Sequence, residues 1–175
     1  MKILAFGASS SSKSINKQLA AYTASLVPNA EVELLDLNDF EMPIYSSDRE
    51  EADGVPVLAQ AFLDHIKAAD ALVISFAEHN GAYSAAYKNI FDWASRINNK
   101  MFLGKSMLLT STSPGKGGAA SVLAFASNSM PFFDGKVVAS VSVPSFYDNF
   151  DAKKGEVSNA EIATQLKQAA ADLVG

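Results

Sequence analysis

The chain contains no cysteine, which excludes disulfide bonds, a thiolate nucleophile, the usual sulfur-ligated zinc site and iron–sulfur clusters. Its two histidines, His65 and His79, are too few for a three-histidine metal site, so we expect no metal centre. Positive charge is also scarce, because 14 lysine and arginine residues stand against 19 aspartate and glutamate residues. A net charge of −5 offers no cationic field for a nucleic-acid backbone, and we expect no nucleic-acid partner.

Long apolar runs are absent as well. No run approaches the roughly eighteen residues that a membrane-spanning helix needs, and the apolar stretch 3–8 is too short for a signal peptide. We therefore expect a soluble, cytoplasmic protein without a membrane partner. What is present is a globular composition, with 49% hydrophobic residues in 175 residues, which predicts a single domain over residues 1–175.

Short β-branched or leucine-rich runs alternate with longer segments of helical period, a pattern typical of a parallel sheet covered by helices. Strands are expected at residues 2–7, 31–37, 71–77, 106–112 and 137–143. Apolar residues at helical spacing predict helices over 15–26, 58–69, 87–97, 119–130 and 162–173. The last helix is expected to begin from Ser158, with Glu161 completing a capping box, and residues 38–54 and 145–157 are expected to be loops.

Polar residues gather in the segments that follow three of these strands, at residues 7–16, 77–84 and 111–118. Strand-to-helix turns need Gly, Ser and Asn as turn formers and caps, so any one of these loops has a purely structural interpretation. In an open parallel sheet, however, ligands bind outside the carboxyl ends of the strands. Three such loops on one rim therefore indicate a binding site.

The first of these loops, residues 7–16, opens a helix with several serines and one cation, Lys13. Free backbone N–H groups, hydroxyl donors and the positive end of a helix suit a phosphate group. A triphosphate would require a Gly-Lys-Ser/Thr loop, which the sequence lacks, and no Gly-x-Gly-x-x-Gly pattern follows the first strand. The loop thus predicts a ligand that ends in a single phosphate.

The second loop leads into a helix with a specific pattern: Glu78-His79-Asn80-Gly81, then Lys88-Asn89, then Asp92-Trp93. This pattern resembles the signature of the NADPH-dependent FMN reductase family, Pro-Glu-Tyr-Asn-Gly-Ser followed by Leu-Lys-Asn and Asp-Trp, and the resemblance covers nearly the whole chain. The family comprises flavodoxin-like quinone, azo and chromate reductases. The resemblance implies an α/β fold, a flavodoxin-like three-layer α/β/α sandwich whose five-stranded parallel sheet has the order 2-1-3-4-5.

The resemblance also implies FMN as the cofactor and NADH or NADPH as the reductant. It places the FMN phosphate on the first loop and the isoalloxazine ring beside the second and third loops. The implied cofactor-binding residues are Ser9, Ser11, Lys13, Ser14, Ile15, Asn16, Glu78, His79, Asn80, Gly81, Ser113, Pro114, Gly115, Gly117 and Gly118. No side-chain acid or base is required, because the flavin carries the chemistry, so no catalytic residue is predicted.

The sequence departs from the family pattern at several of these positions. The phosphate-binding arginine of the family falls at Ser11, and its tyrosine falls at His79. Lys13 lies two positions after Ser11 and is placed to supply the missing charge, as a point charge where arginine would be bidentate.

The expected function is an FMN-dependent NAD(P)H oxidoreductase that passes electrons to a quinone, an azo compound, free flavin or a metal oxyanion. The alternative is a flavodoxin-type carrier that binds FMN without oxidising NAD(P)H. A serine hydrolase is a remote alternative, because no Gly-x-Ser-x-Gly elbow occurs.

The resemblance also predicts a homodimer or homotetramer. The helix over 87–97 supports this prediction, because it adds Trp93 and Ile97 to an already apolar face. Lys88 and Asp92 are interpreted as a surface ion pair, His65 as structural, and Phe91 and Trp93 as packing or subunit-interface residues.

Overall fold

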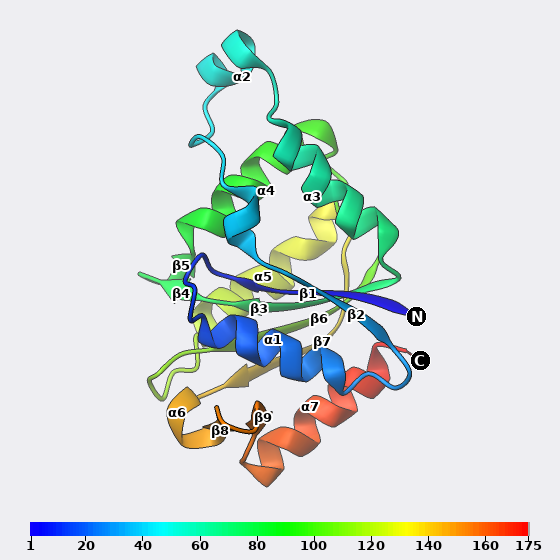
Figure 1. Cartoon of the computed structure of the whole chain (residues 1–175), viewed down its shortest axis with the longest axis vertical. Helices are drawn as coiled ribbons and strands as arrows, with labels where there is room; N and C mark the ends of the chain where they lie inside the picture. The colour runs from blue at the N-terminus through cyan, green and yellow to red at the C-terminus, as the bar shows by residue number, and fades with distance from the viewer. Residues whose placement is uncertain (175) are drawn as a thin grey trace.

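The computed structural model describes residues 1–174 and is built on a central parallel sheet (Figure 1). Its five strands lie in the order β2-β1-β3-β6-β7, and every neighbouring pair is parallel. The strands are β1 (Lys2–Ala8), β2 (Glu31–Leu35), β3 (Ala71–Phe76), β6 (Ser106–Thr112) and β7 (Lys136–Val143). The predicted strands and the order 2-1-3-4-5 are confirmed. The labels differ because β4 (Glu78–His79) and β5 (Ala82–Tyr83) pair separately, as a small hairpin after β3.

Helices cover both faces of this sheet, which confirms the three-layer sandwich (Figure 1). One layer consists of α3 (Val57–Ala68), α4 (Ala85–Ile97) and α5 (Ala120–Ser129). The other consists of α1 (Ile15–Ser25) and α7 (Ala160–Asp172). Successive strand residues point to opposite faces, so Leu4 and Phe6 enter the core under α3, whereas Ile3 and Ala5 enter the core under α7.

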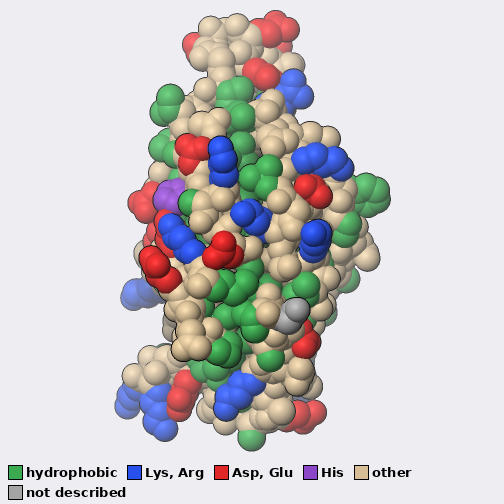
Figure 2. Space-filling model, turned by 90° about the vertical axis from the view of Figure 1, so that its right-hand side faces the viewer, with side chains coloured by type: hydrophobic (Ala, Val, Ile, Leu, Met, Phe, Trp, Pro, Cys, Tyr) green, Lys and Arg blue, Asp and Glu red, His purple; other side chains and the backbone are tan. Residues whose placement is uncertain are grey.

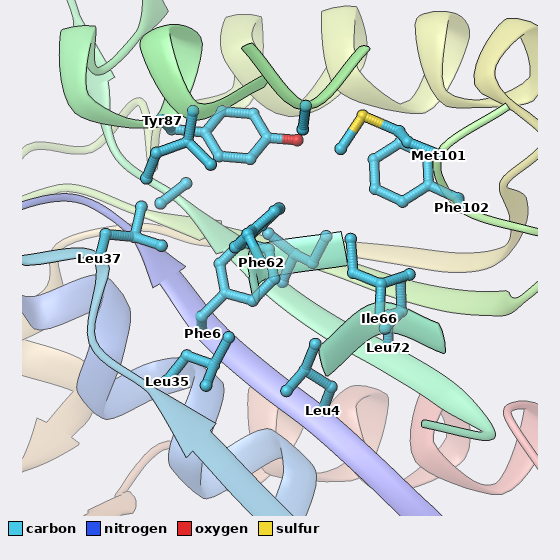
Figure 3. Close-up of a cluster of buried hydrophobic side chains, with 14 of the residues drawn as sticks. Leu4, Phe6, Leu35, Leu37, Phe62, Ile66, Leu72, Tyr87, Met101 and Phe102 are labelled. Atoms are coloured by element: carbon cyan, nitrogen blue, oxygen red, sulfur yellow. The ribbon is translucent and has the colours of Figure 1, made fainter. Parts of the chain in front are cut away.

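Within residues 1–174, the largest cluster of buried hydrophobic residues lies beneath α3 and α4 (Figure 3). Phe6 packs edge-to-face on Phe62 of α3, with ring centroids 5.6 Å apart, and Phe62 packs in the same way on Phe40. Tyr87 of α4 is fully buried in this cluster, and its hydroxyl has no hydrogen-bond partner within residues 1–174. Burial raises the pKa of the Tyr87 phenol well above its usual value.

Three expectations about local structure are wrong. The cap of α7 is Asn159 and not Ser158, because the side-chain oxygen Oδ1 of Asn159 accepts from the backbone N–H groups of Glu161 (3.1 Å) and Ile162 (3.2 Å). The segment 38–54 holds most of the 3₁₀ helix η1 (Leu37–Phe40) and the whole of α2 (Ser47–Asp53). The segment 145–157 holds α6 (Phe146–Asn149) and the hairpin of β8 (Phe150–Asp151) and β9 (Glu156–Val157). Besides these three differences, a short 3₁₀ helix, η2 (Met130–Phe133), follows α5 and has Pro131 in its first turn.

The segment that contains α2 projects from the body of the molecule and is attached to α4 (Figure 1). The Asn89 side chain accepts from Tyr45 N (2.9 Å) and donates to Met42 O (3.0 Å), while the Trp93 indole donates to Pro43 O (2.7 Å). Trp93 is 1% exposed, which confirms a packing role. It therefore has no surface to offer a second subunit.

The predicted ion pair of Lys88 and Asp92 lies on the surface, and His65 makes a contact that was not predicted. The ammonium of Lys88 lies 2.7 Å from the Asp92 carboxylate, as the spacing predicted, and His65 Nδ1 lies 2.6 Å from Glu33 Oε1. Figure 2 shows a side of the molecule on which lysine and arginine side chains are interspersed with aspartate and glutamate side chains. Among residues 1–174, no helix is both long and apolar enough to cross a membrane.

Candidate functional site

The segments that follow β1, β3 and β6 meet at the carboxyl end of the sheet and enclose a cleft of about 230 Å³. This is where an open parallel sheet is expected to bind a ligand. The cleft is lined by Ser9, Ser11, Lys13, Ser14, Ile15, Asn16, Ala77, Glu78, His79, Thr112, Ser113, Pro114 and Tyr147. Most of the predicted site residues are thus brought together, whereas Asn80, Gly81, Gly115, Gly117 and Gly118 lie outside this lining.

The first loop presents the amino end of α1 to the cleft. Ser14 is the N-cap residue of α1, and its hydroxyl oxygen accepts from Lys17 N (3.1 Å), which leaves the hydroxyl hydrogen free to donate to a ligand. The backbone N–H groups of Ile15 and Asn16 lie in the first helical turn, where a helix supplies no internal acceptor. These donors and the positive helix end could hold an anion.

Two lysines lie near this end of α1, and they are placed differently. Lys17 lies one turn into α1 and is paired with Asp36 at 2.5 Å, a contact that holds the pKa of the Asp36 carboxyl below its usual value. Lys13 is exposed and lines the cleft. Lys13 is therefore the cation that an anionic ligand would meet at this end.

Asn16 is fixed by contacts beneath the cleft. Its side chain is 3% exposed, and its Nδ2 donates to Thr112 O (3.1 Å). Its Oδ1 accepts from Thr112 N (3.1 Å) and from the Ser75 hydroxyl (2.8 Å). The side chain therefore joins α1 to the ends of β3 and β6, and its backbone N–H is what Asn16 offers to a ligand.

The second loop is a β-hairpin. Glu78 pairs with Tyr83 and His79 with Ala82, and the two residues between them, Asn80 (φ +54°) and Gly81 (φ +76°), are left-handed. Two consecutive left-handed residues form the type I′ turn that short hairpins favour. Asn80 and Gly81 thus shape the turn, while His79 is exposed at the rim of the cleft.

The carboxylate of Glu78 reaches from this hairpin to α5. Its Oε2 accepts from Val122 N at 2.8 Å, in the first turn of that helix. Ala119, the residue before α5, has φ +58° and provides no side-chain cap. Glu78 therefore accepts a hydrogen bond from a helix N–H group for which the residue before the helix supplies no side-chain acceptor.

The third loop is anchored through Gly118. Its carbonyl oxygen accepts from the hydroxyls of Ser111 (2.7 Å) and Ser142 (2.9 Å). Gly118 has φ +56°, and a Cβ there would clash with Ser142 Oγ and lie 3.0 Å from Pro144 N. The need for glycine at this position is therefore structural, whereas Ser113 and Pro114 face the cleft.

Comparison with known proteins identifies the family. A family model described as NADPH-dependent FMN reductase matches residues 1–148. The chain belongs to the NADPH-dependent FMN reductase family. The predicted family is thereby confirmed.

Individual relatives agree with this assignment. An NAD(P)H-dependent FMN reductase of Pseudomonas aeruginosa is 31% identical over 156 residues, which cover 87% of this chain and 83% of that protein. A quinone reductase of Escherichia coli is 27% identical over 125 residues, which cover 71% of this chain and 65% of that protein. The solved structure of FerB from Paracoccus denitrificans, a flavoenzyme NAD(P)H:(acceptor) oxidoreductase, superimposes with a TM-score of 0.77 at 26% identity, covering 99% of this chain and 94% of FerB.

The cleft of this FMN reductase family member fits the cofactor of the family. The amino end of α1 supplies donors for a terminal phosphate, and the same cleft continues to Glu78 and His79 on one side and to Ser113 and Pro114 on another. An end that suits a phosphate and a second end bounded by two loops match a ligand that carries a phosphate and a ring.

Three residues that line the cleft are not among the predicted cofactor-binding residues. Ala77 and Thr112 lie within two of the three polar loops, but they are buried at or next to the ends of strands and were not singled out. Tyr147 lies on α6 and is 70% exposed at the cleft. The aromatic stretch inside a segment expected to be a long loop was the available signal for Tyr147, because long loops in compact domains are often functional.

Proposed function

We propose that this protein binds FMN in the cleft and acts as an NAD(P)H-dependent oxidoreductase that passes electrons to a small acceptor. A quinone, an azo compound, free flavin or a metal oxyanion is the class of acceptor we expect. The observation that carries the proposal is the continuity of one cleft from the amino end of α1 to the loops after β3 and β6. FMN, when bound, accepts a hydride and releases electrons to the acceptor.

The first task of the chain is to hold the phosphate end of the cofactor. The backbone N–H groups of Ile15 and Asn16 and the Ser14 hydroxyl are placed to donate to phosphate oxygens. Hydrogen bonds to a charged acceptor are stronger than those to a neutral one. Lys13 adds a positive charge at the rim.

The second task is to hold the ring end and limit its contact with water. The β4–β5 hairpin and the loop at Ser113 and Pro114 bound this end of the cleft, and Tyr147 and His79 lie at its exposed margin. Because the reaction needs no proton donor or acceptor from a side chain, orientation of the cofactor is the contribution that we assign to these residues.

The experiment is a titration of the purified protein with FMN, followed by an assay of NADH and NADPH oxidation with a quinone. We expect saturable binding and NAD(P)H consumption above the rate with free FMN. Absence of binding would contradict the whole proposal. Binding without NAD(P)H oxidation would instead favour the flavodoxin-type electron carrier.

We also propose that the protein forms a homodimer or homotetramer. Residues 117–133 contain no charged side chain, and two of their aromatic rings are exposed, Phe125 at 57% and Phe132 at 73%. Exposed aromatic side chains on an uncharged segment of this kind are typical of a subunit contact. Light scattering is expected to give at least twice the chain mass, and a value near 18.5 kDa would contradict the proposal.

Two further proposals concern the chain as a whole. Residues 1–175 are proposed to act as a single FMN-binding domain, which predicts one cooperative unfolding transition. A cytoplasmic location is proposed as well, and fractionation of the source cells tests it.

A further inference from the structure

The amino end of α5 has an unusual cap. Ala119 precedes the helix in a left-handed conformation (φ +58°) and contributes no side-chain hydrogen bond. The donor of Val122 is instead satisfied by Glu78 Oε2 at 2.8 Å, from a residue 44 positions earlier in the chain. A cap is usually supplied by the residue just before the helix, so this long-range contact replaces a missing local one.

The same carboxylate is also placed at the ring end of the cleft. Glu78 lines the cleft with His79 and Ser113, and it is half-buried. Helix amino ends carry a partial positive charge, which a nearby carboxylate offsets. One negative side chain thus lies between the positive end of α5 and the space where we place the flavin ring.

We propose that Glu78 is a positioning residue, which caps α5 to join the hairpin to the third loop and keeps a negative charge beside the flavin. This inference rests on the proposed binding of FMN. Reduced flavin carries more negative charge than oxidised flavin, so the Glu78 carboxylate disfavours the reduced form. Electrons are consequently released more readily to an acceptor.

The competing interpretation is that Glu78 contacts the ring directly, as the family resemblance implies for this position. The two interpretations differ in the protein without FMN. A capping residue stabilises the empty protein, whereas a ring contact matters only once FMN is bound.

The experiment compares Glu78→Gln with Glu78→Ala. Glutamine keeps a carbonyl oxygen that can accept from Val122 N but removes the charge, and alanine removes both. The thermal midpoint of the FMN-free protein is measured first. The dissociation constants of oxidised and of fully reduced FMN are then measured anaerobically.

For Glu78→Gln we expect a thermal midpoint close to that of the unmodified protein and an affinity for oxidised FMN within about twofold. Its affinity for reduced FMN is expected to rise about tenfold, because the neutral amide no longer repels the added negative charge of the reduced flavin. For Glu78→Ala we expect a lower midpoint and weaker binding of both forms. The control, Glu51→Gln, removes an exposed charge on α2 and is expected to change neither quantity.

Several results would overturn the inference. Unchanged midpoints for both Glu78 variants, with weaker binding of oxidised FMN in both, would make Glu78 a direct ring contact. An unchanged ratio of the two dissociation constants in Glu78→Gln would remove the electrostatic role. Failure of the proposed function is distinguishable, because the unmodified protein itself would then bind no FMN, while the midpoints of the FMN-free variants would still test the cap.

Discussion

The side chain of Asn16 holds both backbone groups of Thr112. Its Nδ2 donates to Thr112 O and its Oδ1 accepts from Thr112 N, each at 3.1 Å. The carboxamide therefore imitates a peptide group of a neighbouring strand, and it does so where β6 ends at the cleft. The end of α1 where we propose that the phosphate binds is thus fixed to the loop that bounds the proposed ring end.

The first prediction follows from this pair. Asn16→Ala leaves the backbone groups of Thr112 and the Ser75 hydroxyl without their partner, and unpaired buried groups each cost about 1–3 kcal/mol. We expect a free energy of unfolding lower by roughly 2–4 kcal/mol in urea titrations, with FMN and riboflavin affinities reduced alike. Normal stability with loss of FMN affinity alone would contradict it, since that result would make the amide a phosphate ligand.

A second prediction concerns Ser14. Ser14→Ala removes one donor to the phosphate, and a charge-assisted hydrogen bond of roughly 1.5–3 kcal/mol corresponds to about ten- to a hundredfold weaker FMN binding. Riboflavin, which lacks the phosphate, is expected to bind almost as before in the same fluorescence titration. The matched control is Ser46→Ala, because Ser46 caps α2 through the same contact, with Arg49 N, away from the cleft. Equal losses for both ligands in Ser14→Ala would mean that Ser14 only caps α1.

The third prediction tests the charge at the rim. Lys13→Ala is expected to weaken FMN binding severalfold at low salt, and the difference is expected to shrink as ionic strength rises, because salt screens exposed charges. Lys17→Ala is the control, since the Lys17 ammonium is paired with Asp36 at 2.5 Å. An effect of Lys13→Ala that does not depend on salt would argue against an ionic contact.

A fourth prediction compares two glycines of the third loop, Gly118, where a Cβ would clash with neighbouring atoms, and Gly117, where it would not. Gly118→Ala places a Cβ against Ser142 Oγ at a left-handed backbone position, so we expect a loss of stability of about 2 kcal/mol or more and weaker FMN binding. Gly117→Ala is the control, because a Cβ at Gly117 meets nothing within 4 Å. Denaturant unfolding of the two variants separates them, and equal stabilities would contradict the structural role of Gly118.

The fifth prediction concerns the buried phenol of Tyr87. Tyr87→Phe removes a hydroxyl that lacks a partner within residues 1–174, and we expect stability to rise by about 1 kcal/mol at pH 8. Burial raises the pKa of Tyr87 in the folded state, so the unfolded state ionises first when the pH passes the ordinary value near 10. The native protein therefore loses stability above about pH 10, and the advantage of Tyr87→Phe is expected to grow there. Unfolding curves at pH 8 and pH 11 test this, and a variant less stable at both would contradict it.

The fold was largely predictable from the sequence because its main elements bury continuous or periodic apolar residues. The runs that became β1, β3 and β6 are almost wholly buried, and such runs are readable without tertiary information. The short elements α2 and α6 were missed, because seven and four residues are too few to show a helical period.

The candidate site was predictable in part, for a related reason. The polar residues of the sequence identified the three loops, and residues from all three line the cleft. The Asn80-Gly81 pair is the sequence signal of a two-residue hairpin, which explains their left-handed backbone without a ligand. The contact between Glu78 and Val122 depends on two loops meeting in space, and no local pattern encodes it.

Two residues of the sequence signature, Asn89 and Trp93, form hydrogen bonds with the backbone of residues 42–45 and do not line the cleft. They hold the segment that leads into α2, a helix with no buried residue, and α2 itself is tied to α4 by the ion pair of Glu50 with Arg96 at 2.9 Å. Part of the family signature therefore has a structural role. A sequence search with this signature therefore selects for the attachment of the α2 segment to α4 as well as for a flavin site. A related protein could keep one of these two features and lose the other.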